Sequence, residues 1–137
     1  MDRYQLAPVR DARARDERLR RGDLAAAVTD ARALEDTLAV ARGRTAEARR
    51  LLAATRVAGP SAATLVLAER YVVRRRRDLQ AAIDEEIRAE VASSSAHDAI
   101  DIARHTLVRA RADREVIERH FTRWREARKR LVERRED

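Results

Sequence analysis

Apolar and small residues recur along the first part of the chain at alternating spacings of three and four. One set falls on every seventh position from Leu24 to Leu52, and a second set follows three residues later. The sets are Leu24, Ala31, Leu38, Thr45 and Leu52, and Ala27, Leu34, Ala41, Ala48 and Thr55. This heptad spacing places one apolar stripe along a helix. It predicts a first helix over about residues 2–56, beginning at Asp2 or at Pro8, since proline is tolerated near a helix start.

Ahead of Leu24 the apolar residues leave this register. Val9, Ala12 and Leu19 do not fall on the heptad positions, and Gly22 lies where the two patterns meet. We therefore expect a stutter or a local bend at this point of the first helix.

The same spacing continues over a longer second stretch and predicts a helix over about residues 61–134. The positions on it are Leu65, Ala68, Val72, Leu79, Ala82, Ala89, Ala96, Ile100, Ala103, Leu107, Ala110, Ile117, Phe121, Trp124 and Leu131. The polar residues that interrupt it are Arg75, Glu86, Ser93, Arg114 and Arg128. A second stripe drifts away at spacing four through Leu79, Ile83, Ile87 and Val91. The apolar heptad positions form the seam through which the two helices pack, and this seam is expected to be weakest between Arg74 and Ser95. A kink is expected at Ser93–Ser95, because serine competes for backbone hydrogen bonds.

A turn at residues 57–61 separates the two helices. Gly59 can end a helix, Pro60 disfavours helix at the preceding residue, and Ser61 can cap the next helix. Helices joined by so short a loop pack antiparallel. The predicted fold is therefore all-α: residues 1–137 form a single domain, a long antiparallel two-helix coiled-coil hairpin with the longer helix at the C-terminus.

Folding symmetrically about Gly59 and Pro60 has two consequences. The start of the first helix then lies beside residues 111–117 of the second helix. The second helix continues beyond that point without a partner, and this unpaired part carries Phe121, Trp124 and Leu131. Like charges also meet: Arg42, Arg44, Arg49 and Arg50 lie near Arg70 and Arg74–Arg77, and Asp30, Glu35 and Asp36 lie near Asp84, Glu85, Glu86 and Glu90. Such bands are mildly unfavourable in a lone hairpin. They indicate either a partner with complementary bands or a different register.

The amino-acid composition further limits the possible fold classes. Of 137 residues, 40 % are charged and 3 % aromatic, with three glycines, two prolines and no cysteine. This excludes a parallel sheet, a β-sandwich and a disulfide scaffold as interpretations. The longest uncharged stretch, 57–68, is too short to span a membrane. No signal peptide is expected, and the lack of cysteine fits a cytoplasmic protein.

The net charge of +7 comes almost wholly from arginine and is uneven. It amounts to +4 over residues 1–56, −2 over 57–103 and +5 over 104–137. Both ends of the chain are therefore basic, while the middle is slightly acidic.

No constellation of residues indicates an enzyme or a cofactor. A two-helix pair has little interior for an active site, and the chain lacks a glycine-rich phosphate loop and the metal-binding and nucleophile motifs. Asp101 and His105 could touch a metal, although a solvated helix face is the simpler reading. We predict no enzyme activity, no cofactor and no metal.

Two arginine-rich stretches are candidates for contact with a partner. Arg74–Arg77 spread around the helix, which favours a solvated face over one bound ligand, with phosphate or a protein as alternatives. The segment 119–125, RHFTRWR, holds the only Phe and the only Trp. Aromatic residues with arginine are typical of protein interfaces and of single-stranded nucleic-acid binding. Phe121 and Trp124 also lie on the heptad seam, so both rings could instead pack against helix 1.

The chain resembles the FliJ/YscO group, the central-stalk proteins of flagellar and virulence type III secretion. The likeness rests on the hairpin organisation and mainly on the block 115–128, EVIERHFTRWREAR. The resemblance implies a fold like the coiled-coil part of the γ subunit of rotary ATPases. It also implies a non-enzymatic protein that inserts its joined ends into a hexameric export ATPase. On the other side, the protein would link the ATPase to the export gate, a membrane protein, or to secretion chaperones.

The resemblance also suggests contact residues. The ATPase contact would use Arg10, Arg13, Phe121, Trp124, Arg128 and Leu131, and the export-gate contact would use Tyr71 and Val72. It implies a cytoplasmic protein, peripheral to the inner-membrane secretion apparatus, with no nucleic acid bound and no direct insertion into the membrane.

Two other functions remain open from the residues alone. A basic helix could bind nucleic acid or the ribosome, although 24 interspersed acidic residues keep any face from being uniformly positive. A generic coiled-coil scaffold is the third alternative, and it would form a stable oligomer where an isolated stalk would be a monomer.

Overall fold

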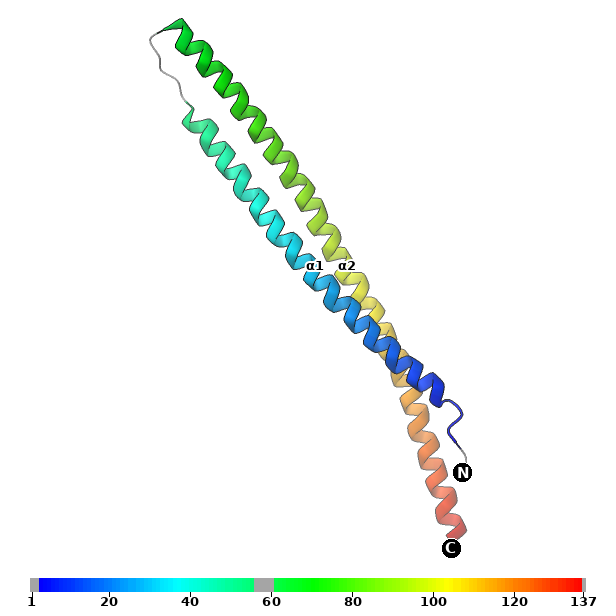
Figure 1. Cartoon of the computed structure of the whole chain (residues 1–137). Helices are drawn as coiled ribbons and strands as arrows, with labels where there is room; N and C mark the ends of the chain where they lie inside the picture. The colour runs from blue at the N-terminus through cyan, green and yellow to red at the C-terminus, as the bar shows by residue number, and fades with distance from the viewer. Residues whose placement is uncertain (1–2, 56–60, 137) are drawn as a thin grey trace. The chain divides into compact units, whose positions relative to one another are not determined.

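The computed structural model describes residues 3–55 and 61–136 and contains two helices (Figure 1). Helix α1 is Ala7–Ala54, with 48 residues, and α2 is Ala62–Glu136, with 75 residues. The described residues contain no strand. The helices run antiparallel and pack against each other, which confirms the predicted all-α helical hairpin with a longer second helix. Neither helix, over the residues described, holds a stretch apolar enough to cross a membrane.

The helix ends follow local chemistry. Residues 3–6 precede α1 without being helical, and Pro8 lies in the first turn, where its missing N–H does no harm. Ser61 caps α2, since its Oγ accepts a hydrogen bond from the Thr64 N–H at 3.2 Å. The predicted turn residues 57–60, including Gly59 and Pro60, lie outside the described part of the chain.

The contacts divide the chain into two units. The terminal unit comprises Met1–Val28 with Ala99–Asp137, and the middle unit comprises Thr29–Asp98. In each unit a segment of α1 lies antiparallel beside a segment of α2 (Figure 1).

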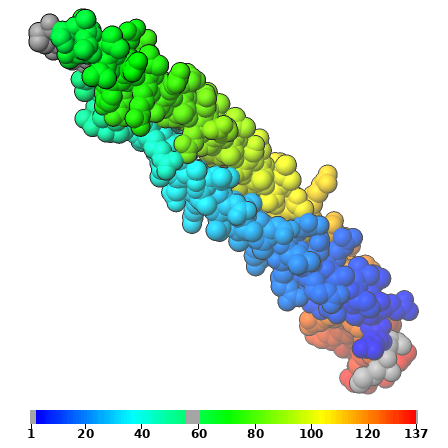
Figure 2. Space-filling view, turned by 45° about the horizontal axis from the view of Figure 1, so that its top comes forward, coloured from blue at the N-terminus to red at the C-terminus, as the bar shows by residue number. Residues whose placement is uncertain are grey.

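The core of the middle unit is built from small residues on the predicted seam. Leu38, Ala41 and Ala89 form its buried cluster. Figure 2 shows the cyan part of α1 packed against the green part of α2. Thr45 is 1 % exposed, and its hydroxyl donates to the Ala82 carbonyl of α2 and to the Ala41 carbonyl of its own helix, each at 3.2 Å. A hydrogen bond from a short side chain to the main chain of the other helix requires the helices to lie close together, and alanine permits that approach.

The seam of α2 persists where it was expected to be weakest. Ala89 and Ser93 are both buried, and the helix continues through Ser93–Ser95 as one element. The drifting stripe leaves the interface, because Ile87 is 54 % and Val91 61 % exposed. Heptad position therefore decides burial more strongly than hydrophobicity does.

The expected phase shift before Leu24 is wrong. Val9 is 44 % and Leu19 67 % exposed, whereas Glu17, seven residues before Leu24, is only 4 % exposed. Arg10, seven residues earlier again, is half-buried. The heptad continues in phase to the start of α1, but charged side chains occupy it. The apolar residues alone do not reveal this continuity.

The expected register in the middle unit is also wrong. Symmetric folding puts Arg44 beside Arg75, but Arg44 lies 2.7 Å from Glu85, ten positions further along α2. Arg42 lies 3.8 Å from Glu86 and 3.4 Å from Glu90. Basic residues of α1 therefore face acidic residues of α2 in this unit, and these opposite charges pair within the chain.

Candidate functional site

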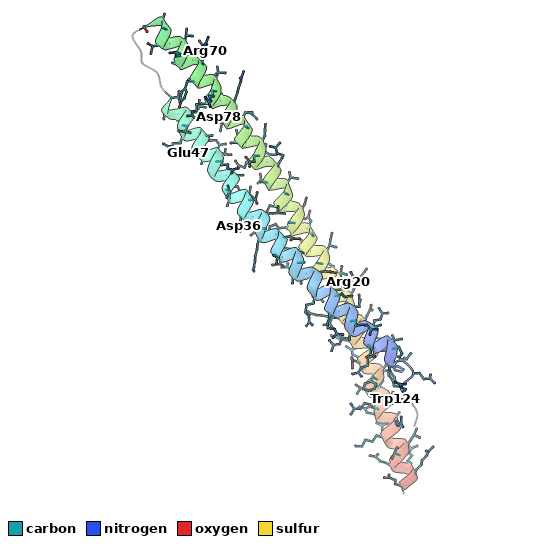
Figure 3. The ribbon with its side chains drawn as sticks, viewed as in Figure 1. Arg20, Asp36, Glu47, Arg70, Asp78 and Trp124 are labelled. Atoms are coloured by element: carbon teal, nitrogen blue, oxygen red, sulfur yellow. The ribbon has the colours of Figure 1, made fainter. Side chains whose placement is uncertain are left out.

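A cluster of aromatic rings in the terminal unit is the most distinctive feature of the described chain. Tyr4, which precedes α1, lies 5.0 Å from Phe121 and 5.1 Å from Trp124, measured between ring centroids. Phe121 and Trp124 stack at 5.8 Å with 22° between their planes. A 2.8 Å hydrogen bond joins the Tyr4 hydroxyl to Nδ1 of His120. Figure 3 places Trp124 on α2, next to the start of the described chain.

This cluster corrects the expectation that Phe121 and Trp124 project alone. Both rings are half-buried, and Tyr4 is 7 % exposed. The sequence reasoning missed Tyr4 because it lies outside the heptads, and ring stacking has no sequence period. The one available signal was a tyrosine just ahead of a proline at a helix start.

Arginines surround the rings. The Arg10 guanidinium lies 4.1 Å from the Phe121 centroid, and Arg125 lies 5.9 Å from it. Arg128 lies 5.5 Å from the Trp124 centroid. A cation over an aromatic face is attracted by the ring quadrupole. The cluster therefore combines stacked rings with positive charge.

Next to the aromatic cluster, charged side chains connect the two helices. Arg10 donates to Glu118 at 2.7 Å, and Arg13 donates to Asp113 at 3.1 Å. The hydrogen bond from Arg10 lowers the pKa of the Glu118 carboxyl. These partners engage two of the arginines that we expected to contact an ATPase.

Glu17 is the centre of the charged contacts. Its carboxylate accepts hydrogen bonds from Arg114 of α2 at 2.7 Å and from Arg21 of α1 at 2.8 Å, and Arg111 lies 3.7 Å away. The hydrogen bond from Arg114 is the main cause that lowers the pKa of Glu17, and burial acts in the opposite direction. A carboxylate so little exposed is stable here because several cations surround it.

The end of α2 beyond the rings carries the remaining candidate, Leu131. Leu131 is 57 % and Val132 47 % exposed. Six basic and three acidic residues fall within residues 125–136. This segment therefore presents apolar side chains among positive charge.

The two residues expected at an export gate lie in the middle unit, on the early part of α2. Tyr71 is 43 % exposed, and its hydroxyl accepts a 2.7 Å hydrogen bond from Arg75. Val72 is half-buried on the seam.

Nothing in the described residues gathers three potential metal ligands. The Nδ1 atom of His105 lies 2.7 Å from the Asp101 main-chain oxygen, so the histidine contacts the backbone of that residue.

The chain was compared with protein-family models, with curated proteins and with solved structures. None of the three comparisons gave a match.

Proposed function

We propose that this chain is the non-enzymatic central stalk of a type III secretion apparatus, as its resemblance to the FliJ/YscO group suggests. It would enter a hexameric export ATPase with its terminal unit and link that ATPase to the export gate or to secretion chaperones. The antiparallel pairing of two long helices supports this proposal at the level of fold.

One observation carries the proposal: exposed apolar side chains and six basic residues on the last turns of α2, directly after the aromatic cluster. Aromatic and arginine side chains are enriched where protein partners bind most tightly. The stacked rings would hold the end of α2 in a fixed position relative to the start of α1.

The contacts divide the candidate residues by role. Phe121 and Trp124 are packed on Tyr4, so they would support the binding surface from within. Arg10 and Arg13 are engaged by Glu118 and Asp113, so they would hold the two helices together. Arg128, which lies over the Trp124 ring, and the exposed Leu131 would make the direct contact with the ATPase. Tyr71 and Val72 keep the proposed export-gate contact.

The first test is a tagged pull-down from the native cells at physiological salt after nuclease treatment, read by mass spectrometry. Recovery of a hexameric export ATPase or an export-gate protein supports the stalk. Recovery of ribosomal proteins or of partners that depend on nucleic acid overturns it and favours the nucleic-acid function.

The second test measures ATP hydrolysis by the recovered ATPase with and without this chain. Leu131→Ser combined with Arg128→Gln should abolish stimulation. The matched control is Val108→Ser with Arg109→Gln, which changes an exposed valine and an exposed arginine further back on α2. Equal stimulation by the two double variants would contradict the proposed contact.

A further inference from the structure

The first turns of α2 extend past the end of α1. Leu51, one turn before the end of α1, lines the same surface groove as Arg75 and Asp78 of α2. Because α2 begins at Ala62, about 13 residues precede that level, and at about 1.5 Å per residue they reach roughly 20 Å further. Figure 1 shows the green start of α2 beyond the cyan end of α1, and Figure 3 places Arg70 on this extension.

The extension exposes apolar side chains. Residues 61–68 contain no charged residue. The exposed apolar side chains in and just after this stretch are Leu65 at 53 %, Val66 at 49 %, Leu67 at 66 %, Tyr71 at 43 % and Val73 at 41 %. We call these five residues the apolar tip.

An arginine cluster overlaps and follows the apolar tip. Arg70, Arg74, Arg76 and Arg77 are exposed and form no ion pair with any described residue. We call these four the arginine girdle. Arg75, between them, is turned toward Tyr71 and Asp78 instead. Residues 61–77 contain five arginines and a single acidic residue, Glu69. This excess contrasts with α1 residues such as Arg42 and Arg44, which are paired with acids across the interface.

The directions in which the girdle arginines point around the helix indicate what kind of partner would fit. At about 100° per residue, the outward-facing arginines from Arg74 to Arg77 spread over an arc of roughly 160°. A single partner helix contacts a narrower stripe and would leave part of the girdle unpaired. A flat anionic layer approached by the end of the helix reaches guanidinium groups on every outward side. One guanidinium group can donate two hydrogen bonds to two oxygens of the same phosphate. Tyrosine is enriched at the boundary between water and lipid.

We propose that residues 61–77 dock on a lipid surface that carries anionic phosphate headgroups. The arginine girdle binds the headgroup phosphates, while the apolar tip rests among the headgroups and upper acyl chains. The contact stays at the surface and involves no crossing of the bilayer. It goes beyond the ATPase contact proposed above and is independent of it, because residues 61–77 belong to the middle unit. It places Tyr71 and Val72, the residues of the proposed export-gate contact, at the membrane surface where that membrane protein lies.

Co-sedimentation of the full chain with vesicles tests this proposal. Neutral phosphatidylcholine vesicles are compared with vesicles that also contain about 30 % phosphatidylglycerol, at physiological salt. We expect binding to the anionic vesicles only. Replacing the girdle by glutamine (Arg70→Gln, Arg74→Gln, Arg76→Gln, Arg77→Gln) should weaken that binding at least tenfold, since each arginine near an anionic surface contributes about fivefold.

The matched control removes the same charge elsewhere, through Arg15→Gln, Arg18→Gln, Arg88→Gln and Arg109→Gln, all at exposed positions. It should bind nearly as well as the original chain. Equal loss in the two quadruple variants would show that net charge alone drives the binding and would overturn the proposal. Absence of vesicle binding, together with girdle-dependent capture on immobilised polyglutamate, would overturn it in favour of an acidic protein partner.

Fluorescence tests the apolar part of the contact. In a Trp124→Phe background, Leu67→Trp places the only tryptophan on the apolar tip. Its emission should shift to shorter wavelength when anionic vesicles are added. An unchanged emission maximum with the chain fully bound would contradict the proposal.

Discussion

Glu17 of α1 and Arg114 of α2 form a 2.7 Å ion pair at heptad positions that coiled coils ordinarily fill with apolar side chains. Glu17 precedes Leu24 by seven residues, and Arg114 lies seven residues after Leu107 and seven before Phe121. The pair sits in the terminal unit, where Arg10–Glu118 and Arg13–Asp113 add further polar contacts. The helices of this unit are thus joined by charge as well as by apolar packing.

The first prediction concerns Glu17 itself. Glu17→Gln removes the charge that the surrounding arginines share and leaves cations facing one another. Hydrogen exchange should become several-fold faster in the terminal unit and remain unchanged in the middle unit. The control is Glu115→Gln, because the Glu115 side chain is 66 % exposed and pairs with Arg119 of its own helix, at 3.4 Å. Equal acceleration in both variants would argue against a central role for Glu17.

The second prediction is a pH dependence. The pKa values of Glu17 and Glu118 are lower in the folded chain than the ordinary value of 4.5. Their stabilisation is therefore fully present above about pH 4.5 and is lost as the pH falls through the folded values. Urea denaturation followed by Trp124 emission should give a constant stability of the terminal unit between about pH 7 and pH 5, and a decline below that. Increased stability on acidification would contradict this assignment. In Glu17→Gln with Glu118→Gln, the decline should be smaller.

The third prediction concerns the hydrogen bond across the middle unit. Thr45→Val keeps the shape of the side chain but removes the hydroxyl that reaches Ala82. The free energy of unfolding should fall by about 1 kcal/mol. Thr122→Val is the matched control, since Thr122 is exposed and its hydroxyl donates to the Glu118 carbonyl of its own helix, at 3.0 Å. Its effect should stay within about 0.5 kcal/mol. Urea denaturation monitored by helical circular dichroism measures both, and indistinguishable variants would refute the proposed contribution.

The fourth prediction is a stabilising substitution. Arg75 occupies a seam position with 26 % of its side chain exposed, and its Nε atom is buried without a hydrogen-bond partner among the described residues. Arg75→Leu removes this unsatisfied donor and places an apolar side chain beside Leu51 and Leu79. We expect the free energy of unfolding to rise by about 1 kcal/mol. Arg76→Leu, at an exposed position, should give no such gain; thermal melting of both proteins provides the comparison.

The fifth prediction separates ring packing from hydrogen bonding at Tyr4. Tyr4→Phe keeps the ring but loses the bond to His120, at a cost of about 1 kcal/mol. Tyr4→Ala removes the ring that covers Phe121 and Trp124, so the emission of Trp124, the only tryptophan, should shift to longer wavelength. An unshifted emission for Tyr4→Ala would mean that the ring does not shield Trp124 in solution.

The heptad spacing predicted the elements and most of the buried residues. Ala31, Leu38, Ala41, Ile100 and Leu107 are all buried, because a fixed period brings them to one side of each helix. The spacing could not predict which turn of one helix faces which turn of the other, since alanine packs almost equally well in several registers. That choice depends on long side chains such as Arg44 and Glu85, whose meeting requires three-dimensional geometry.

The candidate site was predicted only in part. Phe121 and Trp124 were identified from their residue types, but Tyr4 and Glu17 were not. Tyr4 lies in a non-helical segment with no sequence period, and Glu17 is a charged residue at a heptad position where the pattern predicts an apolar one. Burial of a carboxylate depends on cations from another helix, which the spacing within one helix does not reveal.

The ion pair of Glu17 also bears on the choice among alternative pairings. A slip of one heptad would bring Leu107 or Phe121 to the place of Arg114 and leave a carboxylate facing an apolar side chain without its interhelical partner. Such an arrangement is penalised strongly, whereas the alanines would tolerate it. In the terminal unit, one acidic residue therefore disfavours misaligned pairings of the helices. Its replacement by leucine should allow the two helices to adopt more than one alignment.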